Sequence, residues 1–321
     1  MKTLILSVIL LSSAVEAQRL IPASARVQVS DENGSPVRSV AVSGCFLDDS
    51  KSGASDNFDG ITDSKGEFFA KGKTMLGVYA KVVSDGYYPT KHHQWLKAIR
   101  RPDGQGLMRP SRWDITVPVL LKRIKKQIPM YMKEVEYLAV KKQTGASVGH
   151  LVTNSVAGYD LIRGDVIPPY GNGLVSDLEF RWQLKLIPED RVDVSINSSA
   201  LFEIRMANGV DGVCKGKPDG AENGETGSAL ISDYEAPEGG YTNALSIYRN
   251  IRNAKVETND DQHYLYYFRI RTQTNETGQV TNAFYGKIYG QLNGNFTYYL
   301  NPMPNDRNVE HAPKKNLFKS R

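Results

Sequence analysis

The side chains that could do chemistry in this 321-residue chain are scattered carboxylates and five histidines, and no catalytic motif surrounds them. Asp177 and Glu179 would share one face of a strand, because side chains two residues apart in a strand point the same way. Glycoside hydrolysis needs only two carboxylates close together in space. A hydrolase with a carboxylate site outside the known motifs is therefore one hypothesis, and a charged solvent face is the simpler interpretation of the same pair.

The sequence lacks the spacings that carry the commonest enzyme chemistries. It has no G-x-S-x-G of serine hydrolases, no H-E-x-x-H of zinc proteases, no phosphate-binding P-loop and no G-x-G-x-x-G. The acidic stretch at residues 48–59 offers oxygen ligands for Ca²⁺, but it does not fit the EF-hand spacing, and we interpret it as a solvated loop. We predict that the protein is not an enzyme and that it has no catalytic residue, no metal site and no cofactor.

Cysteine usage restricts the redox chemistry of the chain. Only Cys45 and Cys214 are present, which is too few for a disulfide scaffold or for a zinc site built on cysteines. The two residues fall in different predicted domains, and neither has a motif around it. Whether they pair stays open on the sequence alone.

Aromatic residues offer a different kind of candidate site. The chain has 17 tyrosines and three tryptophans, and an aromatic ring can stack on the apolar C–H face of a sugar. The candidate glycan-binding residues are Trp95, Trp113, Tyr266 and Tyr298. Tyrosine is also common in ordinary strands, so core packing is the alternative interpretation.

The first residues, MKTLILSVILLSSAVEAQ, have the pattern of a secretory signal peptide. Lys2 precedes an apolar run at residues 4–11, and the small residues before Gln18 predict cleavage after Ala17, so residues 1–17 would be removed. The run is too short to span a bilayer comfortably, and no later stretch is apolar enough to do so. We expect an exported protein with no transmembrane segment in its mature chain, located in the periplasm, at the cell surface or outside the cell.

Short alternating runs separated by turn residues dominate the first third of the chain. Residues 26–30 alternate as a half-buried strand does, and Asn33-Gly34 is a dipeptide that hairpin turns favour. The stretch GITDSKGEFFAKG, residues 60–72, predicts a tight corner. Its glycines would supply positive φ, the Asp63 side chain would cap the turn, and Phe68 would go to the core.

Three short motifs in this region occur in order and at suitable spacing. They are D-x-x-G-x-P-V at Asp31, Gly34, Pro36 and Val37, T-D-x-x-G-x-F at Thr62, Asp63, Gly66 and Phe68, and G-Y at Gly86 and Tyr87. In these motifs the chain resembles the carboxypeptidase regulatory-like (transthyretin-like) module of secreted bacterial proteins. The resemblance implies a seven-stranded β-sandwich that carries, spaces or stabilises other domains, and it does not imply catalysis. A bacterial Ig-like domain of another type is the alternative.

Some relatives of that fold are enzymes, and the intradiol dioxygenases among them hold iron with two tyrosines and two histidines. Tyr87, Tyr88, His92 and His93 lie close together in this sequence. The family places its histidines one residue apart, so that both face the metal, whereas adjacent histidines on a strand point to opposite faces. We therefore predict no iron site here.

Short strands with turns between them also fill the second half of the chain, and they predict a second β-sandwich. The fold class is thus all-β, with two β-sandwich domains of which the first is transthyretin-like or Ig-like. The expected boundaries are a signal peptide at 1–17, the first sandwich at 24–124, a linker at 125–134, the second sandwich at 135–300 and an extended C-terminal tail at 301–321. We expect Leu317 and Phe318 to dock this tail on the domain surface.

Charge and composition narrow the choice of partners. The net charge of +5 is dispersed along the chain, which argues against nucleic acid. We expect an exported, non-catalytic β-sandwich protein with a structural or adhesive role in the cell envelope, and a polysaccharide or another envelope protein as its partner. The alternatives are a carbohydrate-binding protein that uses its aromatic-rich strand faces and the carboxylate hydrolase described above.

Overall fold

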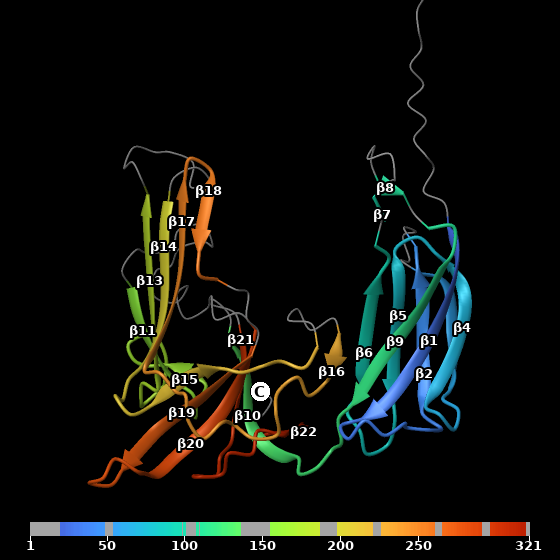
Figure 1. Cartoon of the computed structure of the whole chain (residues 1–321). Coiled ribbons are helices and arrows are strands. Elements are labelled where there is room, and N and C mark those ends of the chain that lie inside the picture. The colour runs from blue at the N-terminus through green and yellow to red at the C-terminus, as the bar shows by residue number, and fades with distance from the viewer. Residues whose placement is uncertain are drawn as a thin grey trace, which may run out of the picture. The chain divides into compact units, whose positions relative to one another are not determined.

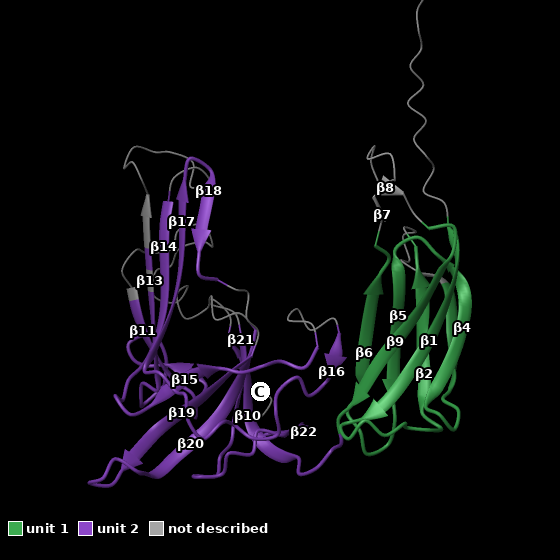
Figure 2. Cartoon of the chain, viewed as in Figure 1, with its two compact units in different colours: residues 1–122 green, residues 123–321 purple. Residues whose placement is uncertain are grey.

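Figure 1 shows the computed structural model of the chain, which describes residues 20–48, 54–97, 99–100, 107–108, 110–135, 155–186, 198–220, 226–260, 265–290 and 296–318. The predicted signal peptide lies outside the described residues. The regular elements of the described part are strands, so the protein is all-β as the alternating patterns predict. Among these residues, none forms a helix that could cross a membrane. The chain divides into two compact units, residues 1–122 and 123–321 (Figure 2).

The first unit is a sandwich of two β-sheets. One sheet has the strand order β4-β1-β9, and in the other β6, β5, β2 and β3 lie side by side in that order. The strands of the first sheet are β1 (Ile21–Asp31), β4 (Glu67–Thr74) and β9 (Trp113–Leu121). The strands of the second sheet are β2 (Ala41–Leu47), β3 (Ala54–Ile61), β5 (Gly77–Val83) and β6 (Thr90–Trp95). A short separate ribbon pairs β7 (Ile99–Arg100) with β8 (Leu107–Met108).

Alternation along these strands builds the core of the first unit. Every second residue of β1 is buried, among them Val27 and Val29. Val117 of β9 and Phe46 of β2 join them, so apolar side chains from both sheets form one cluster. Phe68, which the sequence places in the core, is partly buried against the same cluster. The spacing of apolar residues therefore identifies which face of each strand points inward.

The tight turn predicted within residues 60–72 is confirmed by its hydrogen bonds. Asp63 Oδ1 accepts the N–H of Lys65 at 2.8 Å and the N–H of Glu67 at 2.9 Å. Gly66 has a φ of 73°, and a Cβ at this position would lie 2.5 Å from the carbonyl oxygen of Val29. Only glycine meets both conditions without strain, so this residue is fixed by geometry.

The Thr62 hydroxyl ties this corner to the segment that connects β1 to β2. It accepts the N–H of Val40 at 3.1 Å and donates to the carbonyl of Val37 at 2.8 Å, and the residue is buried. The earlier motif builds a second turn of the same kind, since Asp31 Oδ1 accepts two backbone N–H groups at 3.0 Å and Gly34 has a φ of 75°. Both motifs are therefore structural corners, as the sequence predicts.

The second unit is a sandwich of two six-stranded sheets, with strand orders β15-β19-β20-β21-β10-β22 and β12-β11-β13-β14-β17-β18. The first sheet comprises β10 (Ile128–Val135), β15 (Gly212–Lys215), β19 (Leu265–Thr274), β20 (Val280–Tyr289), β21 (Phe296–Leu300) and β22 (His311–Asn316). The second sheet comprises β11 (Ser155–Asp160), β12 (Asp165–Val166), β13 (Leu178–Leu186), β14 (Ser198–Met206), β17 (Ala244–Arg252) and β18 (Lys255–Thr258). The two-residue strand β16 (Gly227–Ser228) lies between β15 and β17 in the sequence.

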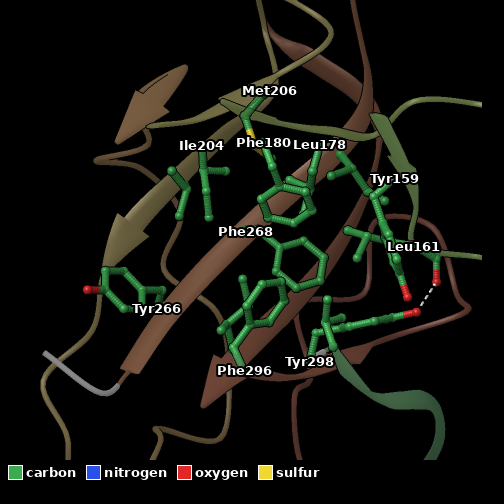
Figure 3. Packing of buried hydrophobic residues seen from close by; sticks show 14 of the residues in the cluster. Tyr159, Leu161, Leu178, Phe180, Ile204, Met206, Tyr266, Phe268, Phe296 and Tyr298 are labelled. Carbon is green, nitrogen blue, oxygen red and sulfur yellow. Dashed lines mark hydrogen bonds between the residues drawn. The ribbon is translucent and has the colours of Figure 1, made fainter. Parts of the chain in front are cut away.

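Two hydrophobic clusters pack against the sheet that contains β19. In the cluster between the sheets, Phe180 and Ile204 meet Phe268 and Tyr298 (Figure 3). Tyr267 belongs to the cluster on the other face, because consecutive residues of β19 point to opposite faces. The strand is therefore buried on both sides, which explains its nearly continuous run of apolar and aromatic residues.

The structure corrects the expected linker and tail, because both contain strands of the second unit. Residues 128–135 form β10 inside a sheet, and residues 311–316 form the edge strand β22 beside it. An edge strand exposes polar side chains, so its composition does not reveal its backbone pairing. Phe318 docks as expected, with its ring centroid 5.1 Å from that of Tyr131, whereas Leu317 stays exposed.

Candidate functional site

The four aromatic residues predicted to bind glycans differ sharply in exposure. Tyr266 and Tyr298 are 2% and 0% exposed in the second unit, so their rings offer no face to a sugar, and this part of the prediction is wrong. Trp113 is partly buried against the core of the first unit. Trp95 is 50% exposed and presents its ring to solvent. Burial on both faces of the sheet is the reason that the tyrosine-rich strands form core and not a platform.

Trp95 belongs to an aromatic row on the outer face of β5 and β6. Its ring stacks on that of His93, with centroids 5.9 Å apart and planes 6° apart. The His93 ring lies 4.7 Å from that of Tyr79, its partner on the neighbouring strand. The row faces outward, because Val78 and Ala80 on either side of Tyr79 point into the core. We call Trp95, His93 and Tyr79 the Trp95 row.

Tyr298 has a structural role in place of the predicted one. Its hydroxyl donates to the carbonyl of Leu161 at 2.8 Å (Figure 3). Its ring packs edge-on against Tyr159, with centroids 6.2 Å apart. Burial raises the pKa of Tyr298, so the hydroxyl keeps its proton and remains a donor at neutral pH. The residue ties β21 of one sheet to the turn that follows β11 of the other.

We expect Tyr298→Phe to lower the free energy of unfolding by about 1–2 kcal/mol, because a buried carbonyl loses its donor while the ring keeps its packing. Urea unfolding of the two proteins measures the difference. Tyr170→Phe is the matched control, since Tyr170 is 40% exposed, and it should leave the midpoint unchanged. Equal behaviour of the two variants would contradict the role given to the Tyr298 hydroxyl.

The structure pairs Asp177 with a different carboxylate from the one that its spacing indicates. Glu179 lies on β13 opposite Arg205, whereas Asp177 is buried just before that strand. The second carboxylate is Asp160, at the end of β11. The guanidinium of Arg271 contacts both, with Nε 2.8 Å from Asp177 Oδ1 and Nη2 3.0 Å from Asp160 Oδ1. Both carboxylates are almost completely buried.

A β-bulge aims Arg271 at these carboxylates. The pairing of β19 with β20 shifts register after Ile270, and Arg271 has a φ of 51°, which residues other than glycine seldom adopt. Asp211 compensates for the interrupted ladder, because its carboxylate accepts the N–H of Arg271 at 3.1 Å and that of Thr272 at 2.8 Å. We call Arg271, Asp160, Asp177 and Asp211 the Arg271 cluster.

The hydrogen bonds of Asp160 show what this cluster can do chemically. Its Oδ1 accepts backbone N–H groups of residues 162–163 and its Oδ2 those of residues 174–175, at 2.9 to 3.1 Å. Burial alone would raise the pKa of Asp160, but these N–H groups and the Arg271 guanidinium outweigh it and lower the pKa. For Asp177 burial is the larger effect and raises the pKa, although Arg271 opposes it. The Asp160 carboxylate therefore uses its lone pairs to hold the backbone of two loops in place. Few lone pairs remain for general acid–base catalysis.

A second buried polar cluster lies on the other face of the same sheet. Lys287 and Ser232 are 1% and 0% exposed, and Lys287 Nζ donates to Ser232 Oγ at 3.0 Å. The Tyr289 hydroxyl donates to the same oxygen at 3.1 Å, and Lys287 Nζ lies 4.7 Å from the centre of the Tyr289 ring. Burial and the nearby Lys287 lower the pKa of His311 to about 4. A lysine beside a serine can activate a nucleophile, but burial keeps this pair away from any substrate.

Comparisons with known proteins give only distant likenesses. No protein-family model matches the chain, and no curated protein matches it. A 3-chlorocatechol 1,2-dioxygenase from Rhodococcus opacus 1CP is 11% identical and covers 34% of this chain, with a TM-score of 0.24. A catechol 1,2-dioxygenase from Acinetobacter radioresistens is 13% identical and covers 36%, with a TM-score of 0.26. BcpA, the major pilin subunit of Bacillus cereus, is 12% identical and covers 88% of this chain, with a TM-score of 0.24.

The coverage of the matched proteins is partial as well. This chain spans 62% and 56% of the two dioxygenases and 68% of the pilin subunit. Likeness at this level does not transfer an activity or a partner. The function therefore has to be argued from the residues of this chain.

The histidines of the first unit lie as strand geometry predicts. His93 belongs to the Trp95 row on the outer face, whereas His92 points to the other face. There its Nε2 atom is buried and has no hydrogen-bond partner within the described residues, and burial lowers its pKa. The two rings cannot face one metal ion from opposite sides of a sheet. In the described part of the chain, no three side chains of His, Cys, Asp or Glu gather as metal ligands.

The remaining sequence candidates have ordinary surroundings. Cys45 and Cys214 are both free thiols, and burial raises the pKa of Cys214 to about 11. Residues 49–53 of the acidic stretch lie outside the described residues. Residues 54–59 belong to strand β3, so this part of the stretch is not the predicted loop. Asp56 of this strand accepts the backbone N–H of Lys73 at 2.7 Å. This bond gives the carboxylate a structural use in joining β3 to β4.

Proposed function

We propose that the protein is an exported structural component of the cell envelope, which acts through its two β-sandwiches and not through catalysis. The observation that supports this proposal is the use of the buried charges. The Arg271 cluster places two carboxylates and a guanidinium where they hold backbone segments together. Breaking such a buried pair costs several kcal/mol, so the cluster favours one rigid conformation. Rigidity and the signal-peptide pattern together suit a durable building block or adhesin.

A deletion strain complemented with plasmid copies tests this role. We expect the deletion to weaken the envelope, measured as survival in detergent and after osmotic shock. Wild-type and Ser232→Ala copies should restore survival equally, because the serine beside Lys287 has no catalytic task. Mass spectrometry of the exported protein should find Gln18 at its N-terminus.

The Ser232→Ala variant makes the proposal falsifiable. It removes the hydroxyl beside Lys287 and leaves the Arg271 cluster untouched, so its fold can be compared with the wild type by circular dichroism. A folded and exported Ser232→Ala protein that fails to restore survival would point to serine–lysine chemistry. Absence of the protein from the envelope fraction would contradict the structural role itself.

The Trp95 row supports a second candidate function, the binding of a polysaccharide. Its three rings lie side by side on an outer sheet face, and Trp95 is the most exposed of them. An exposed indole ring such as that of Trp95 suits the apolar face of a pyranose. We expect Trp95→Ala to weaken binding of residues 18–321 to a polysaccharide by about tenfold, equivalent to about 1.4 kcal/mol, in titration calorimetry.

Phe69→Ala is the matched control for this measurement. Phe69 lies on β4 of the other sheet and is 62% exposed, so it tests whether any exposed ring contributes. Equal losses in the two variants would indicate non-specific adhesion. No saturable binding across a panel of polysaccharides and peptidoglycan would remove the candidate.

A further inference from the structure

The first and last strands of the first unit pair with each other in parallel. Strands β1 and β9 run side by side from the pair Ala23 and Trp113 to the pair Asp31 and Leu121. β1 lies inside its sheet between β4 and β9, and β9 forms the edge. The first strand is thus held on one side by an antiparallel neighbour and on the other by the last strand of the same unit.

Side chains reinforce this pairing on the exposed face. The hydroxyl of Ser24 donates to the carboxylate of Asp114, and Arg26 Nη2 donates to Thr116 Oγ1 at 3.3 Å. On the opposite face the inward residues of both strands belong to the core cluster. The two strands are therefore joined by backbone, polar and apolar contacts at once.

The second unit has a shorter version of this arrangement, in which the parallel ladder pairs only Ile128 with His311 and Met130 with Asn316 and shifts register between these two pairs. Its first strand β10 lies between β21 and the edge strand β22, and β10 and β22 are parallel. The N–H of Ile128 donates to the carbonyl of Glu310, and the N–H of Leu317 donates to the carbonyl of Met130, each at 2.9 Å. Strands β10 and β22 come from opposite ends of this unit in the sequence.

Two side chains extend the β10–β22 pair beyond its backbone ladder. The Asn316 amide imitates a backbone unit, because Oδ1 accepts the N–H of Met132 at 3.0 Å and Nδ2 donates to the Met132 carbonyl at 2.9 Å. The buried carboxylate of Glu310 accepts the N–H groups of Lys125 at 2.8 Å and Lys126 at 2.5 Å. The chain that enters β10 is thus fastened to the strand that ends the unit.

Parallel pairing determines how such a pair responds to tension along the chain. Tension pulls the beginning of the first strand backward and the end of the last strand forward. Because the strands are parallel, these two points lie at opposite ends of the pair, and the pull runs along the strands. The strands must then slide, so their hydrogen bonds have to break together. If both points lay at the same end, the bonds would open one after another.

We propose that each unit is a tension-bearing link in which the parallel first and last strands form a clamp. The inference rests on the structural role proposed above and specifies it: the protein resists tension applied along the chain between the start of β1 and the end of β22. The β1–β9 clamp and the β10–β22 clamp each lie within one unit. The observation that supports this role is that the first and last described strands pair in parallel in both units.

Single-molecule pulling of the whole mature chain from two different attachment points tests the proposal. In the first geometry, handles at the N-terminus and C-terminus load both clamps in shear. In the second, an azido amino acid in place of the exposed Asn33 replaces the N-terminal handle, so the first unit is pulled from the same end of β1 and β9. An unfolded chain extends by at most about 3.3–3.6 Å per residue, so the length released identifies each unit.

We expect the first unit to unfold at a force higher by roughly twofold or more in the first geometry, because several hydrogen bonds must break in one step. The second unit is loaded in the same way in both geometries and serves as the internal reference. Equal forces for the first unit in both geometries would overturn the clamp. The survival assay of the deletion strain does not depend on these unfolding forces. A failure of the clamp proposal can therefore be told apart from a failure of the proposed envelope role.

A pair of asparagine variants tests the second clamp. Asn316→Ala should lower the unfolding force of the second unit by roughly a third to a half, because it removes two of the hydrogen bonds that join β10 to β22. Asn275→Ala is the control, since Asn275 braces the turn between β19 and β20, where Oδ1 accepts the N–H groups of Thr277 and Gln279. It should change the urea midpoint without changing the force. Equal forces for both variants would overturn the second clamp.

Discussion

Replacing Arg271 with methionine should lower the free energy of unfolding of the second unit by about 3–5 kcal/mol, the usual cost of leaving a buried charge without its partner. Asp160 and Asp177 are 2% and 1% exposed at their side chains, and Arg271 contacts both. Methionine keeps most of the side-chain volume, so the loss reports charge and not a cavity. Urea unfolding followed by tryptophan fluorescence at pH 7 measures it.

The deficit of Arg271→Met should shrink as the pH falls from 7 toward 4. Burial already raises the pKa of Asp177, and removal of the guanidinium raises it further. A carboxyl whose pKa is higher in the folded than in the unfolded protein makes the folded state more stable as the pH falls through that value. In the wild type Asp160 has the opposite sign, because its lowered pKa adds stability above its unfolded pKa that is lost on acidification.

Arg205→Ala is the control for the loss of a positively charged side chain from the same unit. Arg205 pairs with Glu203 at 3.2 Å in the same unit, but its side chain is 49% exposed. An exposed pair of this kind contributes about 0–1 kcal/mol. A loss for Arg271→Met that is no larger than the loss for Arg205→Ala, or that stays constant between pH 7 and pH 4, would contradict the bracing role of the Arg271 cluster.

Alternation and turn chemistry made much of the fold predictable from the sequence. The all-β class, the inward face of β1 and the capped turn at Asp63 all follow from short-range patterns. Such patterns act over two to four residues, so a single sequence displays them directly. The edge strand β22 was missed because its side chains are polar and its pairing is a property of the backbone.

The buried polar clusters could not be predicted for a different reason. Arg271 reaches Asp177 across 94 positions, and Lys287 reaches Ser232 across 55. No spacing rule links residues so far apart. The positive φ at the bulge belongs to Arg271 and not to a glycine, so the sequence does not indicate the bulge. The sequence pairs Asp177 with Glu179, its neighbour at two residues, whereas the fold places Asp177 beside Asp160 and Arg271. The exposure of Trp95 and the burial of Tyr298 depend likewise on how sheets pack.

The glycines of the stretch at residues 60–72 show how one residue type can serve two purposes. The sequence suggests backbone freedom for all of them, and this holds for Gly66, which has a positive φ. It is wrong for Gly60, which lies in β3 with no positive φ. There a Cβ would lie 2.3 Å from Cε2 of Phe68, and the three nearest atoms all belong to that ring. Position 60 requires glycine because the Phe68 ring occupies the space that a side chain would need.

Replacing Gly60 with alanine should therefore lower the free energy of unfolding of the first unit by about 1–3 kcal/mol, the usual cost of overpacking. Phe68→Ala removes the obstacle, so the double variant should be more stable than the sum of the single losses predicts, by about 1–2 kcal/mol. Urea unfolding of the four proteins gives this coupling. Gly209→Ala is the control, since a Cβ there has no atom within 4 Å.

The sign of this coupling decides what holds the corner in place. A favourable coupling means that the Phe68 ring is pinned over Gly60, and that the T-D-x-x-G-x-F motif fixes the approach of β4 to β3 as well as the turn between them. Additive losses would mean that the ring moves aside freely. The corner would then rest on the Asp63 and Thr62 hydrogen bonds alone.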